Sequence, residues 1–215
     1  MAASKMESVT LTDGIRIELN TEVMFVSTAR KVGRQLISDA DFNRLLMDAL
    51  SWATEYMEGE EALAPHILAF YAQDDGTHNL VALVTKGWKD YYSKKQAIVE
   101  MGFMAAEYEN VLAAAFIVTE AWMTQSTSGE LPAVLPSDDP ERVEVVVISG
   151  ATLDERQNQA IVQVERLNGR LRASEVTSIP FIDDGRDQIR NSLLAIFLTS
   201  YSLGYISRRG GGVLW

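Results

Sequence analysis

Cysteine is absent from this chain of 215 residues. Its absence excludes disulfide bonds, thiolate metal sites and cysteine nucleophiles, and it fits a reducing compartment. The hydrophobic fraction of 47% and the charged fraction of 23% are ordinary for a folded globular protein. We therefore expect one core that is large enough to fold without covalent cross-links.

Long apolar runs and basic charge are also scarce. No apolar run reaches the roughly 20 residues that cross a bilayer, and the start of the chain lacks the apolar centre of a signal peptide. We therefore expect a cytoplasmic protein, or a virion-associated one in a host cell, with no membrane partner. The 19 Lys and Arg residues against 30 Asp and Glu residues give a net charge of −11. Since DNA binding needs clustered bases, we expect no nucleic-acid partner.

Familiar catalytic and ligand-binding motifs are missing as well. The chain has no phosphate-binding loop, dinucleotide fingerprint or nucleophile elbow. Residues 39–43 imitate the opening of an EF-hand loop, but Arg44 stands where that loop requires glycine. His66 and His78 lack the spacing of a zinc pair. The expectation is no metal and no cofactor.

The strongest positive signal lies between Val111 and Arg166. Three strand-like runs follow one another there, and two are nearly continuous β-forming apolar residues, as in strands that are buried on both faces. Asn168-Gly169 then predicts a type I′ turn that joins residues 158–166 to residues 171–179 as a hairpin.

Hairpins and helices flank this centre. Asp13-Gly14 predicts a hairpin over residues 8–19, and the Asp-Asp-Gly-Thr-His-Asn run predicts a second one between residues 66–71 and 80–85. Helices are predicted by apolar residues at three- and four-residue steps in 39–58, 89–108 and about 184–204. Ser38 is the predicted N-cap of the first helix, and Gly59 is placed to end it.

The order of these elements predicts an α+β fold: a mostly antiparallel sheet of five or six strands with about three helices on one face, plus the N-terminal hairpin. The helix within 85–111 would make a parallel crossover, and Gly102 suggests close packing of that helix on the sheet. We expect an N-terminal hairpin arm at 1–30, a single domain at 31–207 and a flexible glycine-rich tail at 208–215.

Charged residues gather where the central strands should meet. Glu120 lies near the end of the first long strand, whereas Asp139, Arg142 and Glu144 start the next. Antiparallel pairing would bring the carboxylates to one edge, where they could hold Mg²⁺ or form an acid–base site. The favoured alternative is a structural belt of salt bridges in which Arg142 and Arg166 neutralise the acids.

Two apolar features are candidate binding groups. Trp122 lies on the same face of the strand as Glu120. It could form the floor of a ligand pocket, but we favour a position in the core or in a subunit interface. Val213, Leu214 and Trp215 follow a glycine tether and could enter a groove on a partner. A disordered end is the common alternative for such a tail.

Residues 86–95 mix bases with aromatic residues, in the order Lys-Gly-Trp-Lys-Asp-Tyr-Tyr-Ser-Lys-Lys. Aromatic rings beside cations can grip single-stranded nucleic acid. The patch is short and the chain is acidic, so we favour a solvated first helical turn over a partly buried aromatic pair.

The sequence Glu-Ala-Trp-Met, a long loop and Asp-Pro-Glu-Arg-Val-Glu-Val-Val-Val within residues 110–150 resemble predicted proteins of bacterial and phage genomes that have no assigned activity. The resemblance implies a microbial or phage origin and no catalytic residue. We expect a non-enzymatic binding or assembly protein that self-associates through its hairpin and tail. The alternatives are a metal-dependent hydrolase or nuclease that uses Glu120, Asp139 and Glu144, and an acidic inhibitor of a host or phage protein.

Overall fold

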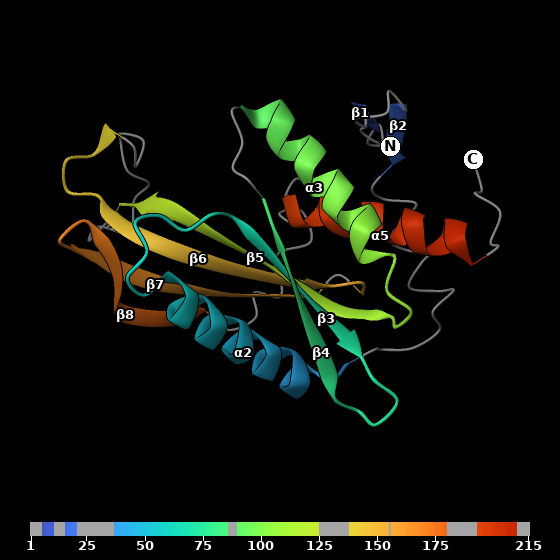
Figure 1. The fold of residues 1–215 in the computed structure, drawn as a ribbon, viewed down its shortest axis with the longest axis horizontal. Helices are drawn as coiled ribbons and strands as arrows, with labels where there is room; N and C mark the ends of the chain where they lie inside the picture. Colours follow the sequence, from blue (N-terminus) through green and yellow to red (C-terminus); the bar gives the residue numbers. More distant parts are fainter. Residues whose placement is uncertain are drawn as a thin grey trace, which may run out of the picture.

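The computed structural model describes residues 6–10, 16–20, 37–85, 90–124, 138–154, 156–179 and 193–209. These form an α+β fold with one curled, antiparallel sheet of six strands in the order β4-β3-β5-β6-β7-β8 (Figure 1). The strands of this sheet are β3 (His66–Ala72), β4 (His78–Val84), β5 (Leu112–Met123), β6 (Val143–Thr152), β7 (Gln157–Leu167) and β8 (Arg170–Ile179). The predicted fold class is confirmed.

Three helices accompany the sheet within the described residues: α2 (Asp39–Met57), α3 (Tyr91–Ala105) and α5 (Leu193–Arg208). Ser38 caps α2 as predicted, because its hydroxyl accepts a hydrogen bond of 3.1 Å from the backbone N–H of Asp41. Gly59 follows the helix with a φ of 82°, in the left-handed region that favours glycine.

The central strands form as the sequence predicts. Phe116 in β5 and Val146 in β6 are both fully buried. The turn between β7 and β8 has φ values of 54° at Asn168 and 80° at Gly169, which is the left-handed geometry that the Asn-Gly pair predicts. Local turn chemistry therefore fixes this hairpin.

The prediction that all helices lie on one face of the sheet is wrong. Helix α2 covers one face, whereas α3 and α5 cover the other (Figure 1). The reason lies in the strands: Leu68 and Phe70 of β3 point toward α2, while Ile67 and Ala69 point toward α3 and α5. A strand that is apolar on both sides needs a cover on each face.

Gly102 makes its close contact with a helix, and the predicted contact with the sheet is wrong. A Cβ atom at this position would lie 2.6 Å from the carbonyl oxygen of Phe197 and 2.6 Å from Cβ of Ser200 in α5. The missing side chain of Gly102 thus lets α3 and α5 pack backbone to backbone over the sheet.

The connection through α3 is the predicted parallel crossover. Strands β4 and β5 are both antiparallel to β3, so they run in the same direction with β3 between them. The chain leaves the edge strand β4, passes through α3 and returns as β5 on the far side of β3. As a result β4 becomes one edge of the sheet and β8 the other.

The predicted N-terminal hairpin is present as β1 (Met6–Thr10) paired with β2 (Arg16–Asn20). Its Asp13-Gly14 turn, the first part of the predicted last helix and the tail at 210–215 lie outside the described residues. The domain boundaries stay a prediction. None of the helices described here combines the length and the apolar character that a bilayer crossing requires.

Candidate functional site at the end of the sheet

The candidate residues lie where β5 ends, β6 begins and the β7–β8 turn follows, at the left of Figure 1. Trp122 is paired with Glu144, and Glu120 with Val146, in the antiparallel register of β5 and β6. The strand pairing therefore brings the ends of the two strands together as the sequence predicts.

A crossing segment, residues 58–65, covers this end of the sheet. It begins beside β8, where the N–H of Gly59 donates to the carbonyl oxygen of Leu171 at 3.1 Å and the N–H of Leu171 donates to Glu60 O at 2.7 Å. It ends at Pro65, directly before the first residue of β3. Since β7, β6 and β5 separate β8 from β3, the segment must pass over all three strands.

Arg166 at the end of β7 links the crossing segment to β6. Its Nε and Nη2 donate to the two carboxylate oxygens of Glu144 at 2.8 and 2.5 Å, and its Nη1 donates to Glu61 O at 2.6 Å. The hydrogen bonds to Glu144 raise the pKa of Arg166 above its ordinary value. A bidentate pair of this kind fixes both side chains.

Glu120 holds the same segment at β5. Its carboxylate accepts a hydrogen bond from the backbone N–H of Leu63. Glu120 also contributes to the electrostatic stabilisation of the charged form of Arg166. The carboxylates of Glu120 and Glu144 therefore both bind groups that keep residues 58–65 in place, which is a structural use of acids at strand ends.

Asp139 has a local contact. Its carboxylate accepts a hydrogen bond of 2.8 Å from the N–H of Glu141, and its carbonyl oxygen accepts one of 3.3 Å from the N–H of Arg142. These contacts form the turn that starts β6. Within the described ranges, no three Asp, Glu or His side chains gather closely enough to hold a metal ion.

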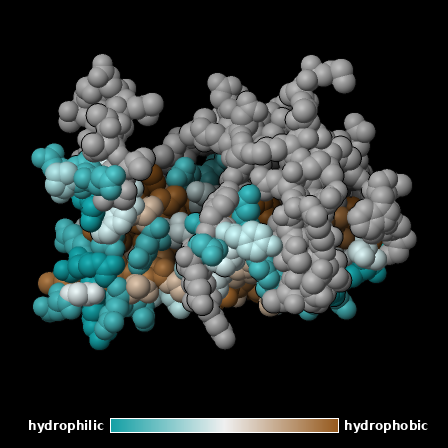
Figure 2. All heavy atoms as spheres, turned by 90° about the horizontal axis from the view of Figure 1, so that it is seen from above, coloured by the Kyte–Doolittle hydropathy of each residue, from teal (hydrophilic) through white to brown (hydrophobic). Residues whose placement is uncertain are grey.

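Trp122 lies on the surface. The indole is 45% exposed, and the guanidinium carbon of Arg142 stands 4.5 Å from the ring centroid. Cation–π contacts of this kind hold a guanidinium flat on the ring. In the view from above, hydrophilic side chains cover most of this end of the molecule, with hydrophobic ones showing between them (Figure 2). Trp122 is therefore outside the core, and the core position is wrong, whereas the other preferred position, in a subunit interface, stays a prediction.

An aromatic cluster beside the crossing segment was not predicted from the sequence. His66 is 1% exposed, and its ring packs edge-on against Trp52 and Tyr56 at centroid distances of 4.9 and 4.7 Å. Its Nδ1 donates to Ala64 O at 2.5 Å, while its buried Nε2 has no hydrogen-bond partner. Burial lowers the pKa of His66. Trp52 and Tyr56 are one helical turn apart, which was the available signal.

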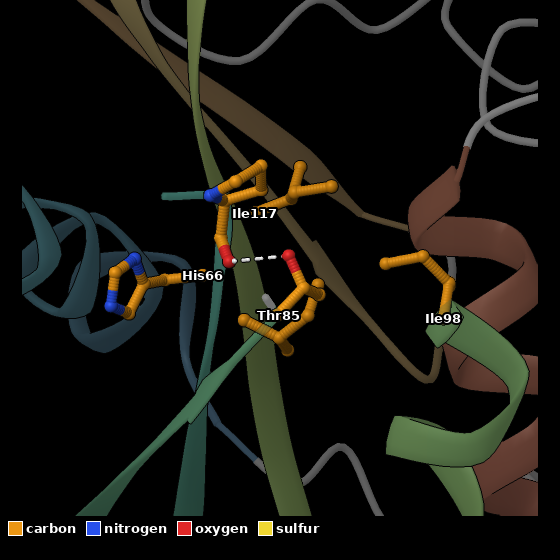
Figure 3. Close-up of a pocket in the computed structure, with 6 residues that line it drawn as sticks. His66, Thr85, Ile98 and Ile117 are labelled. Carbon is orange, nitrogen blue, oxygen red and sulfur yellow. Dashed lines mark hydrogen bonds between the residues drawn. The ribbon is translucent and has the colours of Figure 1, made fainter. Parts of the chain in front are cut away.

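A small hollow lies on the other side of β3 (Figure 3). Its walls are too close together to admit a water molecule. Its lining consists of Pro65, His66, Ile67, Thr85, Ile98 and Ile117. The His66 ring points away from Ile98 and Ile117, toward α2, so that its unpaired nitrogen is not presented to the hollow. This space is a packing gap between a strand and α3.

The remaining candidates cannot be placed, since Val213, Leu214, Trp215 and residues 86–89 lie outside the described residues. No protein-family model matches the chain, and no curated protein or solved structure matches it either. The geometry of the described residues is therefore the basis for any functional assignment.

Proposed function

We propose that the protein is a non-enzymatic binding or assembly protein that associates with copies of itself. The observation that carries the proposal is the Trp122–Arg142 pair, a large apolar ring that lies exposed under a guanidinium. Tryptophan and arginine are the residue types that most often dominate the binding energy of protein interfaces.

The use of the nearby acids supports the same proposal. Catalysis or metal binding needs carboxylates that can reach a substrate, but Glu144 is engaged by Arg166 and Glu120 by Leu63 N–H. Both contacts help to hold the crossing segment on the sheet. A structural role is therefore enough to explain why Glu120 and Glu144 lie at this end of the sheet. The exposed surface of Trp122 has no such role and is the candidate for contact with a partner.

The N-terminal hairpin and residues 210–215 remain part of the proposal as additional self-association elements. An isolated two-stranded ribbon is marginal in water and must pack on another surface. In this structure β1 lies against α3 of the same chain, so the role of the hairpin in self-association stays a prediction. The microbial or phage origin stays a prediction.

Sedimentation velocity between about 1 and 300 µM tests the proposal. We expect a concentration-dependent increase in mass, and we expect Trp122→Ala to weaken association by about 10-fold or more, the effect of losing an interface anchor. Leu167→Ala is the matched control, since Leu167 is also exposed, at 59%, and lies at the β7–β8 turn.

A chain that stays monomeric at every concentration would refute self-association. Removing residues 210–215 separates the contribution of the tail: an unchanged oligomer would defeat the role of Val213, Leu214 and Trp215. Far-ultraviolet circular dichroism of each variant verifies that the fold is retained.

A further inference from the structure

Strand β4 is an edge of the sheet, and its outer side has no hydrogen-bonded strand among the described residues. The N–H of Thr85 donates to Pro65 O at 3.2 Å, and the N–H of Gln73 donates to Thr77 O at 2.9 Å. Odd-numbered residues of β4 therefore bond inward to β3. Because the direction alternates along a strand, the N–H and C=O groups of Leu80, Ala82 and Val84 point outward.

None of the usual protections of an edge strand is found on β4. Its sequence, His-Asn-Leu-Val-Ala-Leu-Val, has no proline and no Asp, Glu, Lys or Arg, and its pairing with β3 is continuous without a bulge. Ala82 and Val84 are exposed, Val84 at 55%. Long, uncharged, regular edges are templates for the addition of another strand.

Charge is distributed unequally along β4. At the His78 end, Arg44, Asp41 and Asp48 all lie close enough to act on the imidazole. Asp74 and Asp75 occupy the turn just before His78, so the charged residues named at this end are four acids and one base. The other end is apolar: Val84 is paired with His66, the centre of the aromatic cluster. One end of the edge is acidic and the other is not.

We propose that β4 pairs antiparallel with β4 of a second copy of this chain, so that two sheets join across a two-fold axis at Val81. In this register Ala82 lies opposite Leu80 of the second copy, and His78 lies opposite Val84. The inference rests on the proposed function of self-association and names a second surface for it, in addition to that of Trp122.

Electrostatics favour a second copy in this arrangement despite the net charge of −11. Antiparallel pairing places the acidic end of each β4 against the apolar end of the other. The two acidic ends are then separated by six residues of strand, about 20 Å at ~3.4 Å per residue. This exceeds the Debye length of about 8 Å at physiological salt, so the repulsion between them is largely screened.

The junction alone is small, since it involves seven residues from each copy. Interfaces of this size are weak unless other contacts add to them. We therefore expect a dimer that dissociates on dilution through the micromolar range, with Tyr56, 45% exposed on α2, close enough to the edge to contribute.

The test is analytical ultracentrifugation of the full chain and of Ala82→Pro. Proline removes the outward N–H of residue 82 and leaves the inward hydrogen bonds to β3 intact, which is the position where an edge strand tolerates it. By symmetry each dimer loses two hydrogen bonds, so we expect the dissociation constant to rise by about 10-fold or more. Ala82→Thr is the matched control: it keeps the N–H, favours a strand and should preserve the dimer.

Ala82→Lys is the second variant, for the case in which proline disturbs β4. It keeps every backbone group on an exposed site and places two like charges across the axis, so it should also raise the dissociation constant. A wild-type dimer that neither Ala82→Pro nor Ala82→Lys weakens would overturn the inference and leave self-association through another surface. A wild-type monomer at all concentrations would overturn both the inference and the proposed function.

Discussion

The two edges of the sheet are built differently. Strand β8 carries Arg170, Arg172 and Glu175, and its pairing with β7 shifts register between Gln163 and Val164. The crossing segment, residues 58–65, bonds to both backbone groups of Leu171 at the outer side of β8. At the other edge, β4 has no such charge, no register shift and no strand beside it among the described residues.

The difference shows which edge is protected against further pairing. Charge, a bulge and a covering segment are the devices by which natural sheets prevent strand addition, and β8 has all three. The same devices are missing at β4. Another strand can therefore add to this edge, either by chance or because the edge binds a specific partner strand. We therefore call β8 the closed edge of the sheet and β4 the open edge.

The largest expected effect comes from opening the closed edge. Arg166→Ala removes the pair with Glu144, which is only 12% exposed at its side chain, and the hydrogen bond to Glu61 O. We expect the free energy of unfolding to fall by about 2 kcal/mol, because a partly buried carboxylate loses its partner. Urea denaturation measures the change.

Arg172→Ala is the control for that variant, since Arg172 is an exposed cation on β8. Its effect should stay within about 0.5 kcal/mol, as for most surface substitutions. Equal losses from the two variants would show that the crossing segment does not depend on Arg166.

Acid should weaken the region beside the open edge. Burial lowers the pKa of His66 below 6.5 in the folded protein, so below pH 6.5 the unfolded chain binds a proton that the folded chain excludes. Stability should be flat above this pH and fall below it, by up to about 1.4 kcal/mol per pH unit. The measurement is the free energy of unfolding by urea at pH values from 7.5 to 5.

His66→Phe sharpens the experiment, because phenylalanine can occupy the aromatic cluster without titrating. The slope below pH 6.5 should decrease, with a residual part from His78, whose pKa burial also lowers. An unchanged slope would mean that His66 does not contribute to it.

A smaller effect should follow from removing the charges on β8. The double variant Arg172→Val with Glu175→Val leaves the crossing segment in place but makes the rest of that edge resemble β4. We expect additional association above about 100 µM in light scattering, since an uncharged edge accepts strands more readily. If the association state equals that of the wild type, charge is dispensable and the crossing segment alone closes the edge.

The smallest expected effect is the change in melting temperature when a divalent metal ion is added. In the proposed account the carboxylates of Glu120 and Glu144 close the sheet end through protein contacts, so 5 mM Mg²⁺ or Mn²⁺ should shift the melting temperature by less than about 1 °C. A larger rise that disappears in Glu144→Gln would instead favour the metal-dependent hydrolase.

Local signals in the sequence predicted local structure well. Asn168-Gly169, the Ser38 cap and the apolar runs of β5 to β7 each specify a conformation through nearby atoms. The side of the sheet that each helix covers was predicted wrongly, because an apolar stripe shows that a helix needs a partner surface and does not show which surface it meets. Gly102 was assigned to the sheet for the same reason.

In the candidate site, too, contacts set by strand order were predictable and contacts between distant segments were not. The approach of Glu120 to Glu144 was predictable from strand order, and so was a belt in which Arg166 neutralises an acid. The crossing segment was not predictable, since its contacts join residues such as Glu61 and Arg166 that lie 105 positions apart. The open edge at β4 was not visible either, because strand order, which decides the edges, depends on the crossover through α3.

Hydrogen exchange of single backbone amides tests the central claim, that the sheet has one open edge, most directly. At about 20 µM protein, the amides of Ala82 and Val84 should exchange rapidly, whereas those of Leu83 and Leu171 should be protected. At about 1 mM, Ala82 and Val84 should become protected as the second copy binds. Slow exchange of Ala82 and Val84 in the dilute protein would contradict the account, because it would show that the chain itself already covers β4.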